Sequence, residues 1–226
     1  LLLSAPIGSG HRLAAEALEQ AFADRPEVEV IHGNIFDFFP QFLGKAFLGT
    51  YLWILKCCPW LYKLAYSWGN KQGGSLWLRE LLNRLLAWLG GSYLRSVQPD
   101  AVIATHATPA GIIGYYKKQH PKLWLGAVVT DFTIHRWWVC DGVDTYFIAD
   151  ELLRDKLATD ADIQATGIPV RQQFMIKHDK QKCREFFGWD ENERVCLLMG
   201  GGEGLLPMAE IITALQRAAL KNLRVV

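Results

Sequence analysis

The sequence predicts an α/β fold in which strand–helix units surround a parallel sheet, followed by the beginning of a second αβ unit. Two observations lead to this prediction. Short apolar runs alternate with helical patterns along most of the 226 residues, and the alternation breaks once, at 167–169, and then starts again. Alternating strands and helices are typical of βα units, because parallel strands need crossover connections.

The first unit pairs the apolar run 1–5 with a helix at 11–23, whose apolar face holds Leu13, Ala14, Ala17, Leu18 and Phe22. Further strands are expected at 28–31, 101–105, 123–130, 145–149 and 162–165, with helices at 109–118 and 151–158. After Gly167-Ile168-Pro169 we expect a helix at 180–187, a strand at 195–199, a helix at 206–220 and a strand at 223–226. Residue 1 is Leu, the first residues read as a strand already under way, and 223–226 read as a strand just beginning, so we expect a fragment.

Composition excludes several classes of protein. Half of the residues are hydrophobic, which is enough for a full core, and the formal net charge of +1 predicts no nucleic-acid partner. The cysteines are odd in number and show no C-x-x-C spacing, so we expect reduced thiols and no bound metal. They are Cys57, Cys58, Cys140, Cys183 and Cys196.

The turn Gly8-Ser9-Gly10-His11 follows the first strand and opens the first helix. Glycines let the chain turn sharply there, and open α/β sheets place ligands at the carboxyl ends of their strands. A neutral His11 at this position could accept a proton from an attacking hydroxyl. On spacing alone, a helix-capping or merely exposed histidine is an equal alternative.

A second glycine-rich turn, Met199 to Gly204, also lies between an apolar strand and a helix. It lacks the Lys-Ser/Thr ending of a P-loop, but Gly200, Gly201 and Gly202, with Glu203 and Gly204, allow a diphosphate to approach the backbone. We favour phosphate binding here over a flexible turn.

The segment 129–138 places polar residues at the end of a buried strand and follows them with Trp137 and Trp138. Asp131, His135 and Trp138 could line an acceptor site; alternatively, Asp131 caps a turn and the tryptophans pack on the sheet. His106 ends the strand 101–105 and is expected at the same sheet edge.

The segment 41–95 is rich in aromatic and basic residues. It holds five tryptophans and seven basic residues but one acid, Glu80. Lys56, Pro59 and Lys63 interrupt its most apolar part, so a transmembrane helix is not expected. Interleaved tryptophan and lysine predict contact with an anionic lipid surface. The alternative is helices that pack on the core.

Together these motifs resemble the monogalactosyldiacylglycerol synthase family (glycosyltransferase family 28), which includes bacterial processive diacylglycerol glucosyltransferases. The resemblance runs in order over most of the chain. It is carried by 4–11, 99–103, 129–132 with His135 and Trp138, 143–146, 167–171 with Phe174, and 200–204.

The resemblance implies a GT-B fold of two Rossmann-like domains, here a lipid-acceptor domain at 1–167 and the start of a UDP-sugar domain at 168–226. It implies transfer of a hexose from UDP-galactose or UDP-glucose to diacylglycerol with inversion, at the cytoplasmic face of a membrane. No Asp-x-Asp motif was identified, so no bound metal is expected, and no cofactor is expected either. His11 matches the general base. Acceptor contacts are expected from Gly8, Gly10, Asp131, His135 and Trp138, and donor contacts from the glycine turn and Arg171.

Two other functions remain open from the sequence. A related transferase that adds N-acetylglucosamine to a polyprenyl-linked peptidoglycan precursor shares the architecture and a glycine-rich first turn. A non-catalytic module that binds a lipid surface would also fit the segment 41–95. The breadth of that segment favours the diacylglycerol enzyme.

Overall fold

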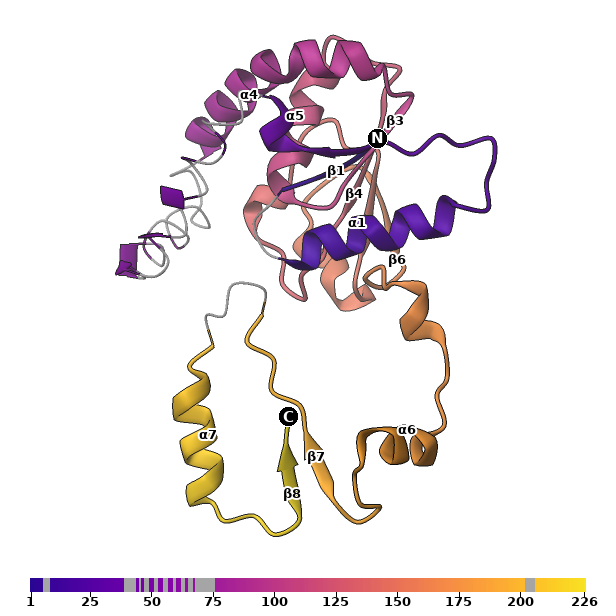
Figure 1. Ribbon diagram of the computed structural model, residues 1–226. Coiled ribbons are helices and arrows are strands. Elements are labelled where there is room, and N and C mark those ends of the chain that lie inside the picture. Colours follow the sequence, from indigo (N-terminus) through magenta and orange to yellow (C-terminus); the bar gives the residue numbers. More distant parts are fainter. Residues whose placement is uncertain are drawn as a thin grey trace. The chain divides into compact units, whose positions relative to one another are not determined.

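The computed structural model describes residues 1–5, 9–38, 44, 46, 49–50, 53–54, 57–58, 60–61, 64, 67, 76–201 and 206–226. The chain divides into two compact units, Leu1–Arg171 and Gln172–Val226. The predicted α/β class is confirmed, because the larger unit is built on a six-stranded parallel sheet (Figure 1).

The sheet of the first unit has the strand order β2-β1-β3-β4-β5-β6. The strands are β1 Leu2–Ser4, β2 His32–Asn34, β3 Ala101–Ala104, β4 Trp124–Val128, β5 Thr145–Ile148 and β6 Asp162–Ala165. In the register, Leu3 lies opposite Gly33 on one side and Ala104 on the other. The strand order reverses between β1 and β3, and open α/β sheets bind ligands at such a switch point.

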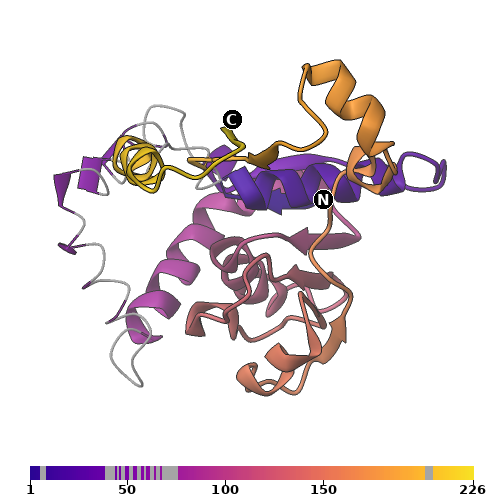
Figure 2. The same cartoon turned by 90° about the horizontal axis from the view of Figure 1, so that it is seen from below.

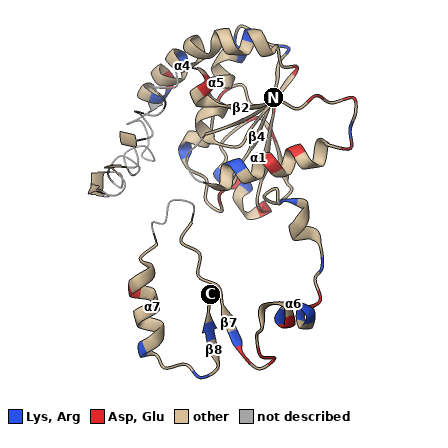
Figure 3. Ribbon diagram, viewed as in Figure 1, with Lys and Arg blue, Asp and Glu red and all other residues tan. Residues whose placement is uncertain are grey.

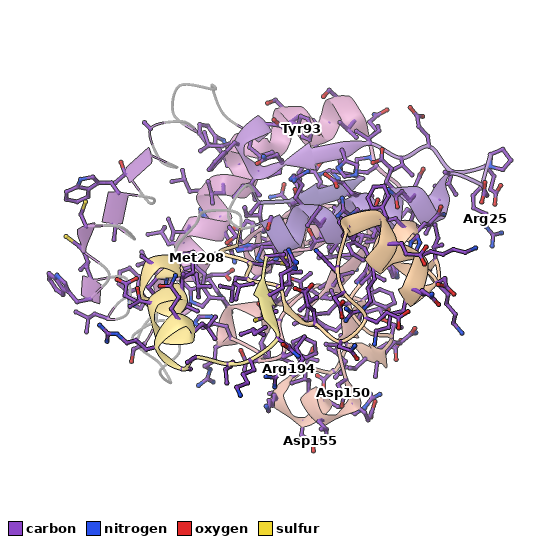
Figure 4. The ribbon with its side chains drawn as sticks, turned by 60° about the horizontal axis from the view of Figure 1, so that its bottom comes forward. Arg25, Tyr93, Asp150, Asp155, Arg194 and Met208 are labelled. Carbon is purple, nitrogen blue, oxygen red and sulfur yellow. The ribbon has the colours of Figure 1, made fainter. Side chains whose placement is uncertain are left out.

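The helices of this unit whose bounds are described throughout are α1 Ser9–Phe22, α4 Leu76–Val97 and α5 Ala107–Lys117. The crossovers from β1 to β2 and from β3 to β4 run in opposite directions, so right-handed connections place α1 and α5 on opposite faces of the sheet. Figures 1 and 2 show α1 on one face and α5, with α4 packed beside it, on the other. Short 3-10 helices are η1 Ile35–Phe38, η2 Arg136–Trp138 and η3 Glu151–Lys156, the last capped by Asp150 (Figure 4).

Glycines permit the tight packing of α5. A Cβ on Gly114 would lie 2.1 Å from the backbone oxygen of Asp141, and Gly142 opposite it has φ +83°. On the side toward α4, a Cβ on Gly111 would lie 2.5 Å from Nδ2 of Asn83. The middle of α5, from Pro109 to Gly114, is buried throughout. These contacts fix α5, and with it the loop from which α5 begins.

The second strand was predicted too early in the chain. The residues 28–31 precede the strand, which is His32–Asn34, and Val28 is 40% exposed. The observed strand has a small residue at a crowded position, because a Cβ at Gly33 would lie 2.8 Å from the hydroxyl of Tyr93 on α4 (labelled in Figure 4). Two further details differ: Gly10 lies inside α1 rather than in a turn, and 151–156 form a 3-10 helix.

The second unit, taken by itself, pairs β7 Arg194–Cys196 with β8 Leu223–Val225 in parallel. Its other elements are η4 Gln172–Met175, α6 Lys180–Phe187 and α7 Met208–Arg217. Arg194 opens β7 and Met208 opens α7 (Figure 4). A bidentate pair joins Arg224 on β8 to Glu193 with both N–O distances at 2.9 Å.

Candidate active site

The candidate site lies where the chain leaves β1, β3 and β4, at the carboxyl edge of the first unit's sheet. His11 comes from the first turn of α1, Thr105 and His106 follow β3, and Thr130 and Asp131 follow β4. β1 and β3 flank the switch point of the sheet. The structure therefore brings together residues from three loops that the sequence assigned to one edge.

Two hydrogen bonds decide the protonation of His11. Its Nδ1 lies 2.8 Å from the backbone oxygen of Thr105 and 2.7 Å from Oγ1 of Thr130. A carbonyl oxygen can only accept, so Nδ1 carries the proton and donates it. In the neutral ring, the Nε2 lone pair is then left to accept a proton.

Burial keeps His11 neutral. Desolvation lowers the pKa of His11, and this outweighs the opposing effects of the Thr105 carbonyl and the Asp131 carboxylate. At neutral pH the imidazole is therefore in its basic form. An oriented, neutral imidazole with a free Nε2 is what general-base catalysis requires.

His106 is a second histidine at the same sheet edge, and no role was predicted for it from the sequence. Its ring lies edge-on to that of His11, with centroids 4.6 Å apart at an interplanar angle of 85°. Nδ1 of His106 accepts the N–H of Thr108 at 3.1 Å and so caps α5. Burial, with the nearby His11, lowers the pKa of His106 to about 3, so this ring is neutral as well.

Asp131 and Trp138 meet beside the histidines. Nε1 of Trp138 donates to Oδ2 of Asp131 at 3.4 Å, and the rings of Trp138 and His106 are 6.5 Å apart. Trp138 is 2% exposed, so most of the ring lies in the core, as the packing alternative expected. Asp131 is exposed, and so is the neighbouring Phe132.

The loop that carries Trp138 is held by buried polar contacts. The hydroxyl of Tyr146 donates to the Trp138 carbonyl at 2.7 Å and accepts the N–H of Cys140 at 3.0 Å. The thiol of Cys140 donates to the Trp137 carbonyl at 3.0 Å, and burial raises the pKa of this thiol to about 12. These contacts were not predicted, because the motifs that include Trp138 and Tyr146 do not indicate which of their groups form hydrogen bonds in the fold.

Arg79 reaches the same loop from α4. Its Nη1 donates to the carbonyl of Val139 at 2.8 Å and to that of Arg136 at 3.3 Å. Both acceptors flank Trp138, so one arginine connects α4 to the loop beside the histidines. The sequence placed Arg79 only among the basic residues of the segment 41–95.

Comparison with known proteins identifies the family of this chain. Residues 11–170 match the model of the family described as monogalactosyldiacylglycerol (MGDG) synthase, which is more than half of the chain. The chain belongs to the monogalactosyldiacylglycerol synthase family. This confirms the resemblance inferred from the motifs.

Members of the family from bacteria and plants are similar to this chain. A processive diacylglycerol beta-glucosyltransferase of Bacillus pumilus is 27% identical over 91% of the chain and 54% of its own length. The protein of the same name from Bacillus subtilis is 26% identical over the same shares. A probable chloroplastic monogalactosyldiacylglycerol synthase 2 of Oryza sativa subsp. indica is 29% identical over 95% of the chain and 48% of its own length. The chain thus spans about half the length of the curated relatives it matches.

Other residues predicted for a synthase site are more scattered. Nδ1 of His135 accepts the N–H of Trp137 at 3.2 Å and caps η2, which is a local structural contact. Gly10 lies in the first turn of α1, and a Cβ there would meet nothing within 4 Å. Arg171 is the last residue of the first unit. Gly8 lies outside the described residues.

The glycine turn of this family member belongs to the second unit. Gly200 and Gly201 follow the end of β7, and Gly201 has φ +73°, a conformation that favours glycine. Gly202, Glu203 and Gly204 lie outside the described residues. The predicted contact with a diphosphate stays a prediction.

The expectation that no metal is bound overlooked one Asp-x-Asp sequence, Asp160-Ala161-Asp162. It lies at the amino end of β6, whereas the histidines lie at the carboxyl edge of the same parallel sheet. Within the described residues, no group of three or more His, Cys, Asp and Glu side chains could hold a metal ion.

Helix α4 exposes an apolar stripe, the one described feature of the segment 41–95 that forms a continuous face. Trp77 (64% exposed), Leu81 (54%), Leu85 (49%) and Trp88 (76%) recur at spacings of four, four and three residues, so they share one side of the helix. Arg84 lies within this stripe by the same periodicity, and Figure 3 shows basic positions along α4. Lys56, Pro59 and Lys63 lie outside the described residues. Where the chain is described, no helix is both long and apolar enough to cross a bilayer.

Proposed function

We propose that this chain is the acceptor-binding part, with the start of the donor-binding part, of an enzyme that transfers a hexose from UDP-galactose or UDP-glucose to diacylglycerol. The observation that carries the proposal is the tautomer of His11. Its Nδ1–H is tied to the Thr105 carbonyl, which leaves Nε2 as a proton acceptor at the switch point of the sheet. Relatives named as diacylglycerol glucosyltransferase and monogalactosyldiacylglycerol synthase support this substrate class.

The proposed step is a single displacement with inversion. The free hydroxyl of diacylglycerol attacks the anomeric carbon, a C–O bond to the acceptor forms, and the bond from that carbon to the UDP oxygen breaks. The hydroxyl proton passes to Nε2 of His11. Positioned general-base catalysis contributes about 10²–10⁴-fold, and the low pKa of His11 keeps the base available at neutral pH.

The leaving UDP develops negative charge, which backbone N–H groups can stabilise without a metal. We assign this task to Gly200, Gly201, Gly202, Glu203 and Gly204, with Arg171 as a further cationic contact. The assignment is supported by the motif: glycine has no Cβ, so a phosphate can approach the backbone, and the positive φ of Gly201 is a conformation that favours glycine.

The acceptor resides in a membrane, so the enzyme must reach a lipid surface. We propose that the enzyme docks peripherally on the cytoplasmic face of an anionic membrane through the apolar stripe of α4, Trp77, Leu81, Leu85 and Trp88. Exposed tryptophan and leucine on one helix face favour the headgroup region, and Arg84 adds attraction to anionic lipid. This is the observation that favours contact over core packing for the described part of 41–95.

The test is an acceptor and donor screen with the full product of the gene. Lipid products are separated by thin-layer chromatography after incubation with dioleoylglycerol and each of UDP-glucose, UDP-galactose and UDP-N-acetylglucosamine. A glycosyl-diacylglycerol formed from one of the two hexose donors supports the proposal. Transfer of N-acetylglucosamine to a polyprenyl-linked peptidoglycan precursor alone would reassign the substrate, and vesicle binding without any product would indicate a non-catalytic module.

A further inference from the structure

We propose that His106 is a second acceptor-recognition residue, which donates its Nε2–H to an ester carbonyl of the lipid while His11 takes the hydroxyl proton. The inference rests on the proposed function and names a residue that the family motifs do not. It starts from the position of the single proton on each of the two neutral rings.

The hydrogen bonds give the two rings opposite polarity. Nδ1 of His106 accepts the backbone N–H of Thr108 at 3.1 Å, so that nitrogen cannot carry the proton of a neutral ring. The proton is therefore on Nε2, which makes Nε2 of His106 a donor. In His11 the Thr105 carbonyl holds the proton on Nδ1, which makes Nε2 an acceptor. One ring offers an N–H and its neighbour a lone pair.

The two rings are close enough to contact one small group of atoms. Their centroids are 4.6 Å apart and their planes nearly perpendicular. By residue, His106 is half-buried rather than fully enclosed. Its environment holds it neutral, so it presents a directed N–H rather than a mobile charge. The Trp138 ring lies 6.5 Å from that of His106, and its Nε1 donates to the Asp131 carboxylate.

Diacylglycerol has the matching chemistry. Its free hydroxyl gives up a proton, and the ester beside that hydroxyl has a carbonyl oxygen that can only accept. His11 would accept a hydrogen bond from the hydroxyl while His106 donates one to the ester carbonyl, and the ester contact would hold the hydroxyl beside His11. A dialkylglycerol has the hydroxyl but no ester carbonyl, so it should lose the contact with His106 alone.

Two substitutions separate recognition from folding. Asn at 106 keeps an acceptor near the position of Nδ1, and Asn is a favoured N-cap residue, but it has no group at the position of Nε2. Gln keeps an N–H near Nε2 but gives up the cap of α5. H106N should therefore retain the wild-type Tm and lose ester recognition. H106Q should have a lower Tm and retain part of the ester recognition.

The experiment measures kcat/KM of the full gene product for dioleoylglycerol and for its dialkyl ether analogue, in mixed micelles. We expect wild type to prefer the ester about tenfold, the usual effect of one hydrogen bond, and H106N to prefer neither. If His106 had only a structural role, H106N would lower kcat/KM for both acceptors equally and leave the ratio of the two values unchanged.

Each result decides a separate claim. An H106N enzyme that keeps the wild-type ester preference overturns the inference, and so does a wild-type enzyme that uses both acceptors equally. The second result needs no variant, so it holds even if H106N fails to fold. Absence of any glycosylated lipid from wild type, with either acceptor and either hexose donor, overturns the proposed function itself.

Discussion

Polar side chains are usually exposed and apolar side chains are usually buried. The histidine pair at the switch point of the sheet, His11 and His106, and helix α4 depart from this distribution in opposite ways. At the sheet edge, two imidazoles are held in a desolvated setting that lowers the pKa of both. On α4, tryptophan and leucine face outward, while Asn83 is buried and Arg79 donates to an inner loop. Both arrangements are unfavourable for a free soluble domain unless something is gained. Under the proposed function, the two departures have different purposes: the histidines serve catalysis, and the exposed apolar side chains serve contact with a lipid surface.

The largest effect should come from the base itself. His11→Ala in the full gene product removes the proton acceptor, so we expect kcat to fall at least a hundredfold while UDP affinity, measured by calorimetry, changes little. His178→Ala, an exposed histidine of the second unit, is the control and should keep full activity. Retention of most activity by His11→Ala would remove it from the catalytic role.

The buried imidazoles should also make folding sensitive to acid. Because the folded pKa of each is below the unfolded value of about 6.5, the unfolded chain binds more protons, and stability falls as pH decreases from 6.5 toward the folded value. For His106, with a folded pKa of about 3, we expect a loss of about 2 kcal/mol in the free energy of unfolding by pH 5.

Urea unfolding of wild type and H106N at pH 7 and pH 5 checks this expectation. H106N should lose less stability between the two values, because Asn does not titrate. Identical losses in both proteins would show that His106 is not held neutral by the fold.

The inward side of α4 should matter for stability and the outward side should not. Arg79→Met leaves the carbonyls of Val139 and Arg136 without their donor, so we expect a loss of about 1–3 kcal/mol, with looser placement of Trp138 and higher KM for the acceptor. Arg84→Met, on the exposed side of the same helix, should change the free energy of unfolding by less than about 0.5 kcal/mol. Equal losses in both would mean that the two sides of α4 do not differ.

The smallest effects concern the lipid surface. Trp77→Ser and Trp88→Ser should each lower binding to phosphatidylglycerol-containing vesicles several-fold. Added salt should not remove this tryptophan contribution from the wild-type protein. Arg84→Gln should lower the same affinity about fivefold, and this part should vanish near 1 M salt, where the Debye length is about 3 Å. Co-sedimentation measures both. Vesicle binding unchanged in all three variants would assign the stripe to another partner.

The sequence predicted most strands of the sheet because β1, β3, β4 and β5 are largely apolar runs. It placed β2 too early, because His32-Gly33-Asn34 has no apolar run to mark it. His11 and Asp131 could be assigned to one edge because parallel strands end together. The tautomer of His11 could not be predicted from the sequence, since it depends on Thr105 and Thr130, which are 94 and 119 residues away. Arg79 was missed for the same reason.

The thiol of Cys140 has a practical consequence for labelling. Thiolates, not thiols, react with maleimides and iodoacetamides, and with a pKa of about 12 only about one Cys140 in ten thousand is ionised at pH 8. Cys57, by contrast, is exposed within the aromatic and basic segment 41–95. A dye added at pH 7 should therefore attach at Cys57 and leave Cys140 untouched. Once the partly exposed Cys58, Cys183 and Cys196 are replaced by serine, its emission would follow that segment from water into lipid.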